Sequence, residues 1–249
     1  LDATDDFHPF GLIPLRCLNG KGRVLGEKES YWFDLKPTDR AKTITFINLV
    51  LNNHVAKGTI HFTYLGYEAV SQRRKLGSSG SLNDYINDMV GQWRGIDVKG
   101  YTIENVDDPK KQLVIKLEVE EEISDKLNDH DFLLNAFLVE QWKRNPFRSS
   151  ERLYPVDFGS PLEEVTILNL EYPSDYEIDE LPNKVGLVLP QNGGRYIFEM
   201  KNVGNKLSMN NSLLITRPIF TSHEYHYLKE LFNNVIAAEQ TQLVFKKKK

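Results

Sequence analysis

Two adjacent stretches of the sequence decide the fold: residues 43–51 read TITFINLVL, and residues 56–64 read AKGTIHFTY. β-Branched and aromatic residues dominate the first stretch, as they do in β-strands. In the second, apolar and polar residues alternate, so that Ile60, Phe62 and Tyr64 share one face. The asparagines between the two stretches are typical of a turn. The pair therefore predicts a β-hairpin with one buried face.

The strand pattern recurs along most of the chain. Residues 112–123 alternate in the same way, and the residues that share their apolar face are Leu113, Ile115, Leu117 and Val119. Further strands are expected at residues 31–33, 96–106, 132–140, 165–170, 185–189, 195–201, 206–218 and 242–245. Strands and helices do not alternate as in β-α-β units, so the sheets should be antiparallel.

Two helices interrupt the strands, at about 81–94 and 222–240. Ser81 can cap the first, which carries an apolar face made of Leu82, Tyr85, Ile86, Met89, Val90 and Trp93. Thr221 and Glu224 form a capping box at the start of the second. The predicted fold is mainly β, an antiparallel β-sandwich-like architecture with these two helices added.

Composition limits the classes of protein to consider. The chain has 249 residues, 40% of them hydrophobic and 27% charged, which is enough for one large β domain or two ordinary ones. The net charge of −4 is spread along the chain, so a nucleic-acid-binding surface is not expected. The single cysteine, Cys17, excludes an intramolecular disulfide and a multi-cysteine zinc site. The sequence has no apolar run long enough to span a membrane.

The turn residues suggest how the chain is divided. Residues 1–29 contain many glycines and prolines, and we predict an irregular, loosely held segment there. Residues 30–249 should form a large β-rich domain, with a weak internal boundary near residues 145–160. Because the sequence begins without a methionine, we read it as a fragment or a processed chain.

No catalytic or metal-binding constellation stands out among the residues. Cys17 lies between leucines in a turn-rich stretch and is interpreted as an incidental thiol. His223 and His226 stand three apart, not at the spacing that places two zinc ligands on one helix face. The other histidines considered, His54, His61 and His130, are scattered. We therefore predict neither a metal nor a cofactor.

Two further functions remain open from the residues alone. Trp32, Trp93 and Trp142 could form a sugar-stacking surface, which would make the chain a carbohydrate-binding β-sandwich module. Pairs of aspartate and glutamate could serve a free-standing hydrolase, if two carboxylates converge in a pocket.

The first four residues carry a resemblance to a known family. Leu1-Asp2-Ala3-Thr4 resembles the last catalytic motif of transglutaminase-like, papain-type cysteine enzymes, in which Cys, His and Asp follow in that order. Asp2 matches the Asp of that triad. The resemblance implies that its carboxylate accepts the His ring N–H and so fixes the orientation of the imidazole.

The rest of the chain resembles the C-terminal β region that follows this core in large transglutaminase-like proteins of Bacteroidetes-type bacteria. The resemblance rests on residues 9–20, reading PFGLIPLRCLNG, and on residues 66–69, reading GYEA, with Arg73 following. It continues through residues 145–147 and 152–158, reading NPF and RLYPVDF. Leu181-Pro182 and the helix from Glu224-Tyr225 complete the set.

The resemblance implies a non-catalytic chain. The Cys and His of the family precede the Asp, whereas Cys17 follows it, so Asp2 is an orphan triad member, inactive by itself. We expect an accessory, scaffolding or protein-binding domain rather than an enzyme. Its implied partner is the upstream transglutaminase-like core of the same polypeptide, with a protein or peptide substrate as a further candidate. The implied location is the periplasm or the cell surface.

Overall fold

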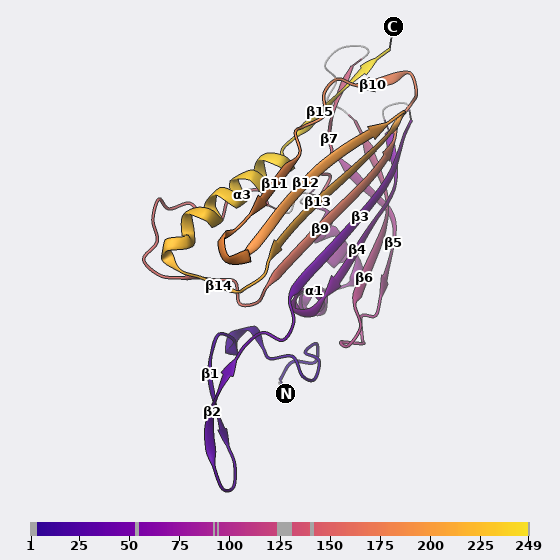
Figure 1. The fold of residues 1–249 in the computed structure, drawn as a ribbon. Coiled ribbons are helices and arrows are strands. Elements are labelled where there is room, and N and C mark those ends of the chain that lie inside the picture. The colour runs from indigo at the N-terminus through magenta and orange to yellow at the C-terminus, as the bar shows by residue number, and fades with distance from the viewer. Residues whose placement is uncertain are drawn as a thin grey trace.

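The computed structural model describes residues 4–52, 55–91, 93, 95–123, 131–139 and 142–248. It confirms a mainly β fold, built around an eight-stranded sheet in the order β11-β12-β13-β9-β3-β4-β6-β5 (Figure 1). These strands are β3 Ala41–Asn52, β4 Val55–Leu65, β5 Ile96–Glu104, β6 Leu113–Glu122, β9 Leu162–Glu171, β11 Val185–Val188, β12 Gly194–Val203 and β13 Lys206–Ile215.

The remaining strands form smaller sheets. A three-stranded sheet has the order β10-β15-β7, and two pairs are β1-β2 and β14-β8. Their bounds are β1 Gly20–Leu25, β2 Ser30–Leu35, β7 Phe132–Asn135, β8 Val156–Asp157, β10 Tyr176–Ile178, β14 Ile219–Phe220 and β15 Gln242–Lys247.

The predicted hairpin is confirmed as β3 and β4, which pair antiparallel with Ile47 opposite Ile60. Ile60, Phe62 and Tyr64 are all buried, as their alternation predicts. The alternation predicted for residues 113–119 is also confirmed, because those four apolar side chains are buried in the same core. Hydrophobic burial on one face thus fixes the register of these strands.

The centre of the sheet contains one pairing that the sequence analysis did not predict. β3 and β9 run parallel, with Ile47 beside Leu168. On either side of this pair, the strands are antiparallel, so two four-stranded halves join into one sheet. The predicted internal boundary at residues 145–160 lies between these halves along the chain, although the sheet itself is continuous. The division into domains stays a prediction.

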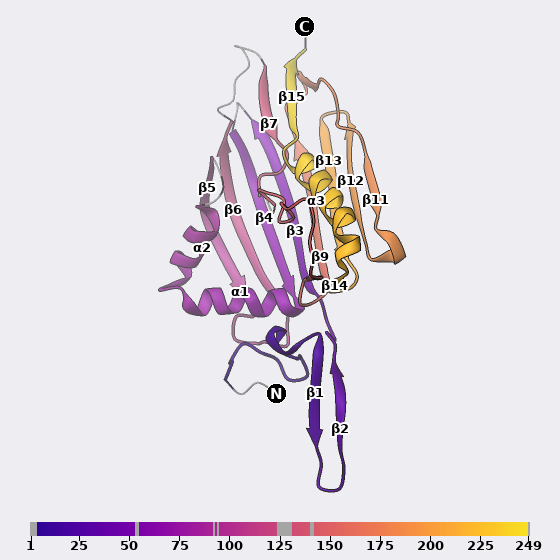
Figure 2. The ribbon, with the colours of Figure 1, turned by 90° about the vertical axis from the view of Figure 1, so that its left-hand side faces the viewer.

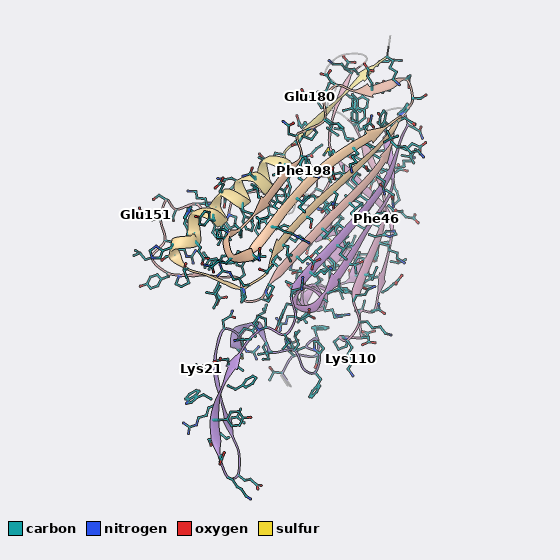
Figure 3. The ribbon with its side chains drawn as sticks, in the orientation of Figure 1. Lys21, Phe46, Lys110, Glu151, Glu180 and Phe198 are labelled. Atoms are coloured by element: carbon teal, nitrogen blue, oxygen red, sulfur yellow. The ribbon has the colours of Figure 1, made fainter. Side chains whose placement is uncertain are left out.

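One face of the sheet is covered by helices (Figure 2). The helices are α1 Gly66–Ser78, α2 Leu82–Val90 and α3 Tyr225–Glu239. α1 packs against β3, β4 and β6, and α3 packs against β12. The three-stranded sheet joins the same core through Phe132 and Phe245, whose rings stack at 4.8 Å. The other face, which includes Phe46, carries no helix among the described residues (Figure 3).

The two predicted helices are confirmed with different limits. α2 ends at Val90 rather than near residue 94, and Ser81 caps it by accepting the backbone N–H of Asp84. α3 begins after a short 3-10 turn, at which Thr221 and Glu224 form the predicted capping box. The strands predicted at residues 132–140 and 206–218 end earlier, as β7 and β13 do.

The helix α1 was not predicted. It begins at Gly66 in a left-handed conformation with no side-chain cap, so the usual sequence mark of a helix start is missing. Its buried residues are Tyr67, Ala69, Val70 and Arg73. Because one of these inward positions is an arginine, the apolar pattern of the helix is short.

Strands β1 and β2 form a two-stranded ribbon that projects from the body (Figures 1 and 2). The prediction that residues 1–29 are irregular is therefore wrong for 20–25, and the predicted domain boundary at residue 29 falls inside this hairpin. Its glycines, Gly20, Gly22 and Gly26, gave the sequence its turn-like appearance. In the part of the chain that the structure describes, no helix is long and apolar enough to cross a membrane.

Candidate functional site

The predicted triad residue, Asp2, lies outside the described residues, as do His54 and His130. Cys17 is an exposed free thiol at the end of a 3-10 turn. Among the described residues, no group of three or more His, Cys, Asp or Glu side chains is placed to hold a metal ion. The candidate site must therefore be built from other residues.

Residues 5–19 are tied to the body at several points, and we call the following four contacts the N-terminal clamp. Asp5 forms an ion pair with Arg74 of α1. Leu12 packs against Tyr67 and Val70. The hydroxyl of Tyr67 donates to the carbonyl of Ile13 at 3.0 Å. Near the end of the segment, Asn19 donates to the carboxylate of Asp157 at 2.8 Å.

The clamp argues against the loose attachment predicted for residues 1–29. His8 and Leu12 are buried, and a ring nitrogen of His8 lies 2.9 Å from the carbonyl oxygen of Leu12. Burial tends to raise the pKa of Asp5, but hydrogen bonds from Arg74 and from the Phe7 N–H outweigh it and lower that pKa. Asp5 is therefore ionised over the physiological range, which favours its pairing with Arg74.

The GYEA motif and Arg73 have a structural explanation. Gly66 has φ +56°, and a Cβ there would lie 2.1 Å from the carbonyl oxygen of Arg40, so only glycine fits. Tyr67 then reaches the N-terminal segment as part of the clamp, while Arg73 is buried against the loop between β5 and β6. The motif thus joins three separate parts of the chain.

The NPF motif fixes the segment after β7 to α3. Asn145 donates to the carbonyl of Lys229 at 2.9 Å, and its side-chain oxygen accepts the N–H of Phe147. The ring of Phe147 packs edge-on against Phe232, with centroids 5.2 Å apart. Buried aromatic contacts of this kind stabilise the connection between the halves of the sheet.

Arg152 and Asp157 of the RLYPVDF motif have opposite charges and lie close in sequence, but they do not form an ion pair with each other. Arg152 donates to the carbonyl of Tyr154 at 3.2 Å. Asp157 instead accepts hydrogen bonds from Asn19 and from the backbone N–H of Gly159, both at 2.8 Å. Proximity in sequence could not reveal the contact to Asn19, because Asn19 and Asp157 are 138 positions apart.

The uncovered face of the sheet is hollowed at one end, with a volume of about 560 Å³. Four adjacent strands place uncharged polar side chains in one row across this hollow: Thr59, Asn48, Asn169 and Ser208. Asn169 donates to the side-chain oxygen of Asn48 at 3.0 Å. The row offers hydroxyl and amide groups inside this hollow.

Charges at the edge of this hollow are paired. Lys57 lies 2.7 Å from Glu120, and Lys206 lies 3.4 Å from Glu171. Both pairs are exposed, so solvent screens them and they add little to stability. The pairing leaves the hollow without an excess of either charge.

On the covered face, two glutamates meet at Trp142. The indole N–H donates to Glu164 of β9 at 2.6 Å, and the backbone N–H donates to Glu239 of α3 at 2.9 Å. The pKa of Glu164 is raised to about 8, because burial disfavours its charged form. The nearby charges of Glu239 and Glu68 raise that pKa further, and the hydrogen bond from Trp142 opposes the increase.

This raised pKa predicts the pH dependence of stability. An acid whose pKa is higher in the folded state gains a proton on folding, so the free energy of unfolding falls as pH rises from about 4.5 to about 8. Glu164→Gln removes this loss. We expect the variant to gain about 4 kcal/mol of unfolding free energy relative to the unmodified chain between pH 5 and pH 9, measured by urea unfolding.

Glu163→Gln is the matched control for that experiment. Burial tends to raise the pKa of Glu163, but hydrogen bonds from Lys42 and Arg40 outweigh it and lower that pKa. Its stabilising contribution is therefore present above about pH 4.5 and is lost as pH falls, the opposite sign. Parallel stability profiles for Glu164→Gln and the unmodified chain between pH 5 and 9 would contradict the prediction.

A second hollow lies beside the N-terminal segment and is lined by Asp5 and Asp6. It does not support the hypothesis of a free-standing hydrolase. Glycoside hydrolysis needs one carboxyl group that stays protonated. Asp5 pairs with Arg74 and its pKa is lowered, so it does not supply that proton.

The three tryptophans do not form one surface. Trp93 and Trp142 are partly buried and pack against the core, whereas Trp32 is 62% exposed on the β1–β2 ribbon. A stacking platform made from all three is therefore excluded. A carbohydrate-binding function must rest on another surface.

One face of the ribbon is entirely apolar or glycine. Cross-strand register places Val24 opposite Tyr31, Gly22 opposite Phe33 and Gly20 opposite Leu35. These six residues define what we call the apolar ribbon face. Tyr31 and Phe33 are 58% and 53% exposed. The sequence analysis predicted strand β2 but not the exposure of its aromatic side chains. The residues of β2 alone do not indicate whether another part of the protein covers them.

Comparisons with known proteins cover parts of the chain. The family profile of a domain of unknown function with a solved structure, DUF3858, matches residues 130–245. No curated protein matches. A crystal structure from Parabacteroides distasonis, of a protein provisionally described as a protease, aligns at 13% identity and a TM-score of 0.39. That alignment covers 48% of this chain and 24% of the other. The second half of the chain is thus similar to a domain family of unknown function.

Proposed function

We propose that this chain is a non-catalytic accessory domain of a transglutaminase-like cell-envelope protein, docked rigidly against the core that carries the catalytic Cys and His. The resemblance of residues 1–4 to the triad motif supports the identity of that core. The N-terminal clamp is the observation that carries the docking, because it fixes residues 5–19 to the body.

The clamp gives the accessory domain a role in positioning. Asp2 is three residues before Asp5, so at most about 11 Å of chain separates it from the Asp5–Arg74 pair. A triad Asp holds the His ring in place, and small misplacements of catalytic groups cost large factors in rate. The domain would therefore act as a fixed support for the last catalytic residue of its neighbour.

Binding of the chain to the separately expressed segment that precedes Leu1 tests this proposal. Calorimetry should show association with a negative heat-capacity change, because apolar surface is buried. No association at high micromolar concentration would overturn the docking. A gene that encodes no Cys- and His-bearing segment before Leu1 would overturn the family assignment.

A second experiment tests the clamp within the full-length polypeptide. Arg74→Gln should increase backbone hydrogen exchange in residues 4–12, because Asp5 loses its partner. Lys75→Gln is the matched control, one residue further along the same helix. Equal exchange in both variants would show that the ion pair does not hold the segment.

The polar row on the uncovered sheet face favours a second candidate, a carbohydrate-binding function. Hydroxyl and amide side chains in a hollow without excess charge suit a neutral saccharide. Asn169→Ala should abolish binding on a glycan array, whereas Asn210→Ala, on the same face but outside the hollow, should not. Absence of any glycan binding by the unmodified chain would exclude this candidate.

A further inference from the structure

The β1–β2 ribbon is incomplete as it stands. Two-stranded ribbons without a covering layer are marginally stable in water. This one makes its hydrogen bonds to the body at its base, through Asn19, and extends away from it (Figures 1 and 2). Most of its length therefore lacks the apolar layer that normally stabilises such a pair of strands.

Its two faces differ in chemistry. The apolar ribbon face carries no charged side chain. The opposite face pairs Lys21 with Asp34 and places the guanidinium of Arg23 5.7 Å from the ring centroid of Trp32. Figure 3 shows Lys21 on this projecting arm. Covering the apolar ribbon face would remove water from hydrophobic surface without desolvating a charge.

The edges of the ribbon are open as well. In the described structure, neither β1 nor β2 pairs with any strand other than its partner. Each therefore presents a row of backbone N–H and C=O groups along its outer edge, which is a template for adding another strand. An apolar face combined with open edges suits a neighbouring β-sheet better than a single helix.

The position of the described N-terminus favours one occupant for the ribbon. The start of the described chain lies beside the base of the ribbon in both ribbon views (Figures 1 and 2). The described chain starts there at Thr4, so a segment that precedes it lies within reach of the ribbon. A second copy of the chain is a poorer fit, because two ribbons paired edge to edge would leave their apolar faces in water, and two ribbons stacked face to face would leave their outer edges unpaired.

We propose that the β1–β2 ribbon adds its strands to a sheet of the segment that precedes Leu1, and that the apolar ribbon face is buried against that segment. The inference rests on the proposed function, which supplies the neighbouring core. It goes further by naming the surface and the mode of contact: strand addition, with Tyr31 and Phe33 as apolar anchors.

The double variant Tyr31→Thr/Phe33→Thr tests the contact directly. Threonine keeps the strand propensity but removes both rings. Its affinity for the separately expressed preceding segment should fall on the order of 100-fold, since buried aromatic anchors dominate interfaces. The isolated chain should keep its melting temperature, because both rings are exposed there.

Leu153→Thr/Tyr154→Thr is the matched control, with two exposed apolar side chains on a loop of the body. It should bind the preceding segment as tightly as the unmodified chain does. An equal loss in both double variants, or none in either, would overturn the inference while leaving the proposed docking intact. No association of the unmodified chain would overturn both.

Hydrogen exchange separates strand addition from a purely side-chain contact. Backbone amides on one outer edge of residues 20–35 should exchange fast in the isolated chain and slowly in the full-length polypeptide. Equal exchange in the two would overturn strand addition. Self-association of the isolated chain that Tyr31→Thr/Phe33→Thr abolishes would assign the ribbon to a second copy and overturn the inference.

Discussion

Replacing Arg73 with methionine is expected to lower the free energy of unfolding by about 3–5 kcal/mol. The side chain is fully buried, and it donates to backbone carbonyls rather than to a carboxylate. The acceptors belong to Asn105, Val106, Asp108 and Lys111, at 2.7–3.1 Å. Methionine keeps much of the volume but leaves all four carbonyls without this donor.

The loss should be visible as a drop in melting temperature of about 10 °C by circular dichroism. Burial lowers the pKa of Arg73, but an arginine stays charged at any physiological pH. Hydrogen exchange should also show that the loop at residues 105–111 opens first, because Arg73 holds it against α1. That local effect distinguishes this mechanism from general damage to the core.

Arg74→Met is the matched control for this substitution. Arg74 is the next residue on α1, but its side chain is partly exposed and pairs with Asp5. Such pairs are worth at most about 1 kcal/mol. Losses of similar size at positions 73 and 74 would show that the carbonyl contacts of Arg73 contribute little.

The second large effect is expected for Gly58→Ala, which should lower the free energy of unfolding by about 3 kcal/mol or more. Gly58 lies on β4 opposite Leu49. A Cβ at this position would lie 1.9 Å from the carbonyl oxygen of Asn48. Since that oxygen belongs to the backbone of the paired strand, the two strands must move apart to admit even one methyl group.

Gly186→Ala is the control for a glycine in a strand. A Cβ at Gly186 would meet no heavy atom within 4 Å. Alanine there should raise stability by about 0.4–1 kcal/mol, since it restricts the unfolded chain. Chemical unfolding of the two variants should thus give changes of opposite sign. A Gly58→Ala variant as stable as the unmodified chain would show that the strands separate at little cost.

Local patterns predicted the elements whose burial is regular. The alternation of Ile60, Phe62 and Tyr64 defines a strand face because only one face of the sheet, the one that the helices cover, is buried there. The capping residues Ser81 and Thr221 marked two helix starts for a similar local reason. The sequence analysis did not predict α1, because one of its buried positions is Arg73 rather than an apolar residue. The hydrogen-bond partners that allow Arg73 to be buried lie more than thirty residues further along the chain.

The candidate site was less predictable than the fold. The pairing of Asn19 with Asp157, and of Asp5 with Arg74, depends on how distant segments pack, which no local pattern contains. The same holds for the polar row, because Thr59, Asn48, Asn169 and Ser208 become neighbours only through the strand order. The motifs at residues 66–73 and 145–147, by contrast, mark residues that hold distant segments of the chain together.

The parallel pairing of β3 with β9 has a consequence for how the chain is made. Asn48 and Asn169, neighbours across this pair, are 121 residues apart in sequence. The hairpins on either side can form from nearby residues, whereas joining them closes a long loop and is intrinsically slow. During synthesis, one edge of β3 therefore stays unpaired until β9 has left the ribosome. An unpaired strand edge promotes aggregation, so the nascent chain is most prone to aggregate during that interval.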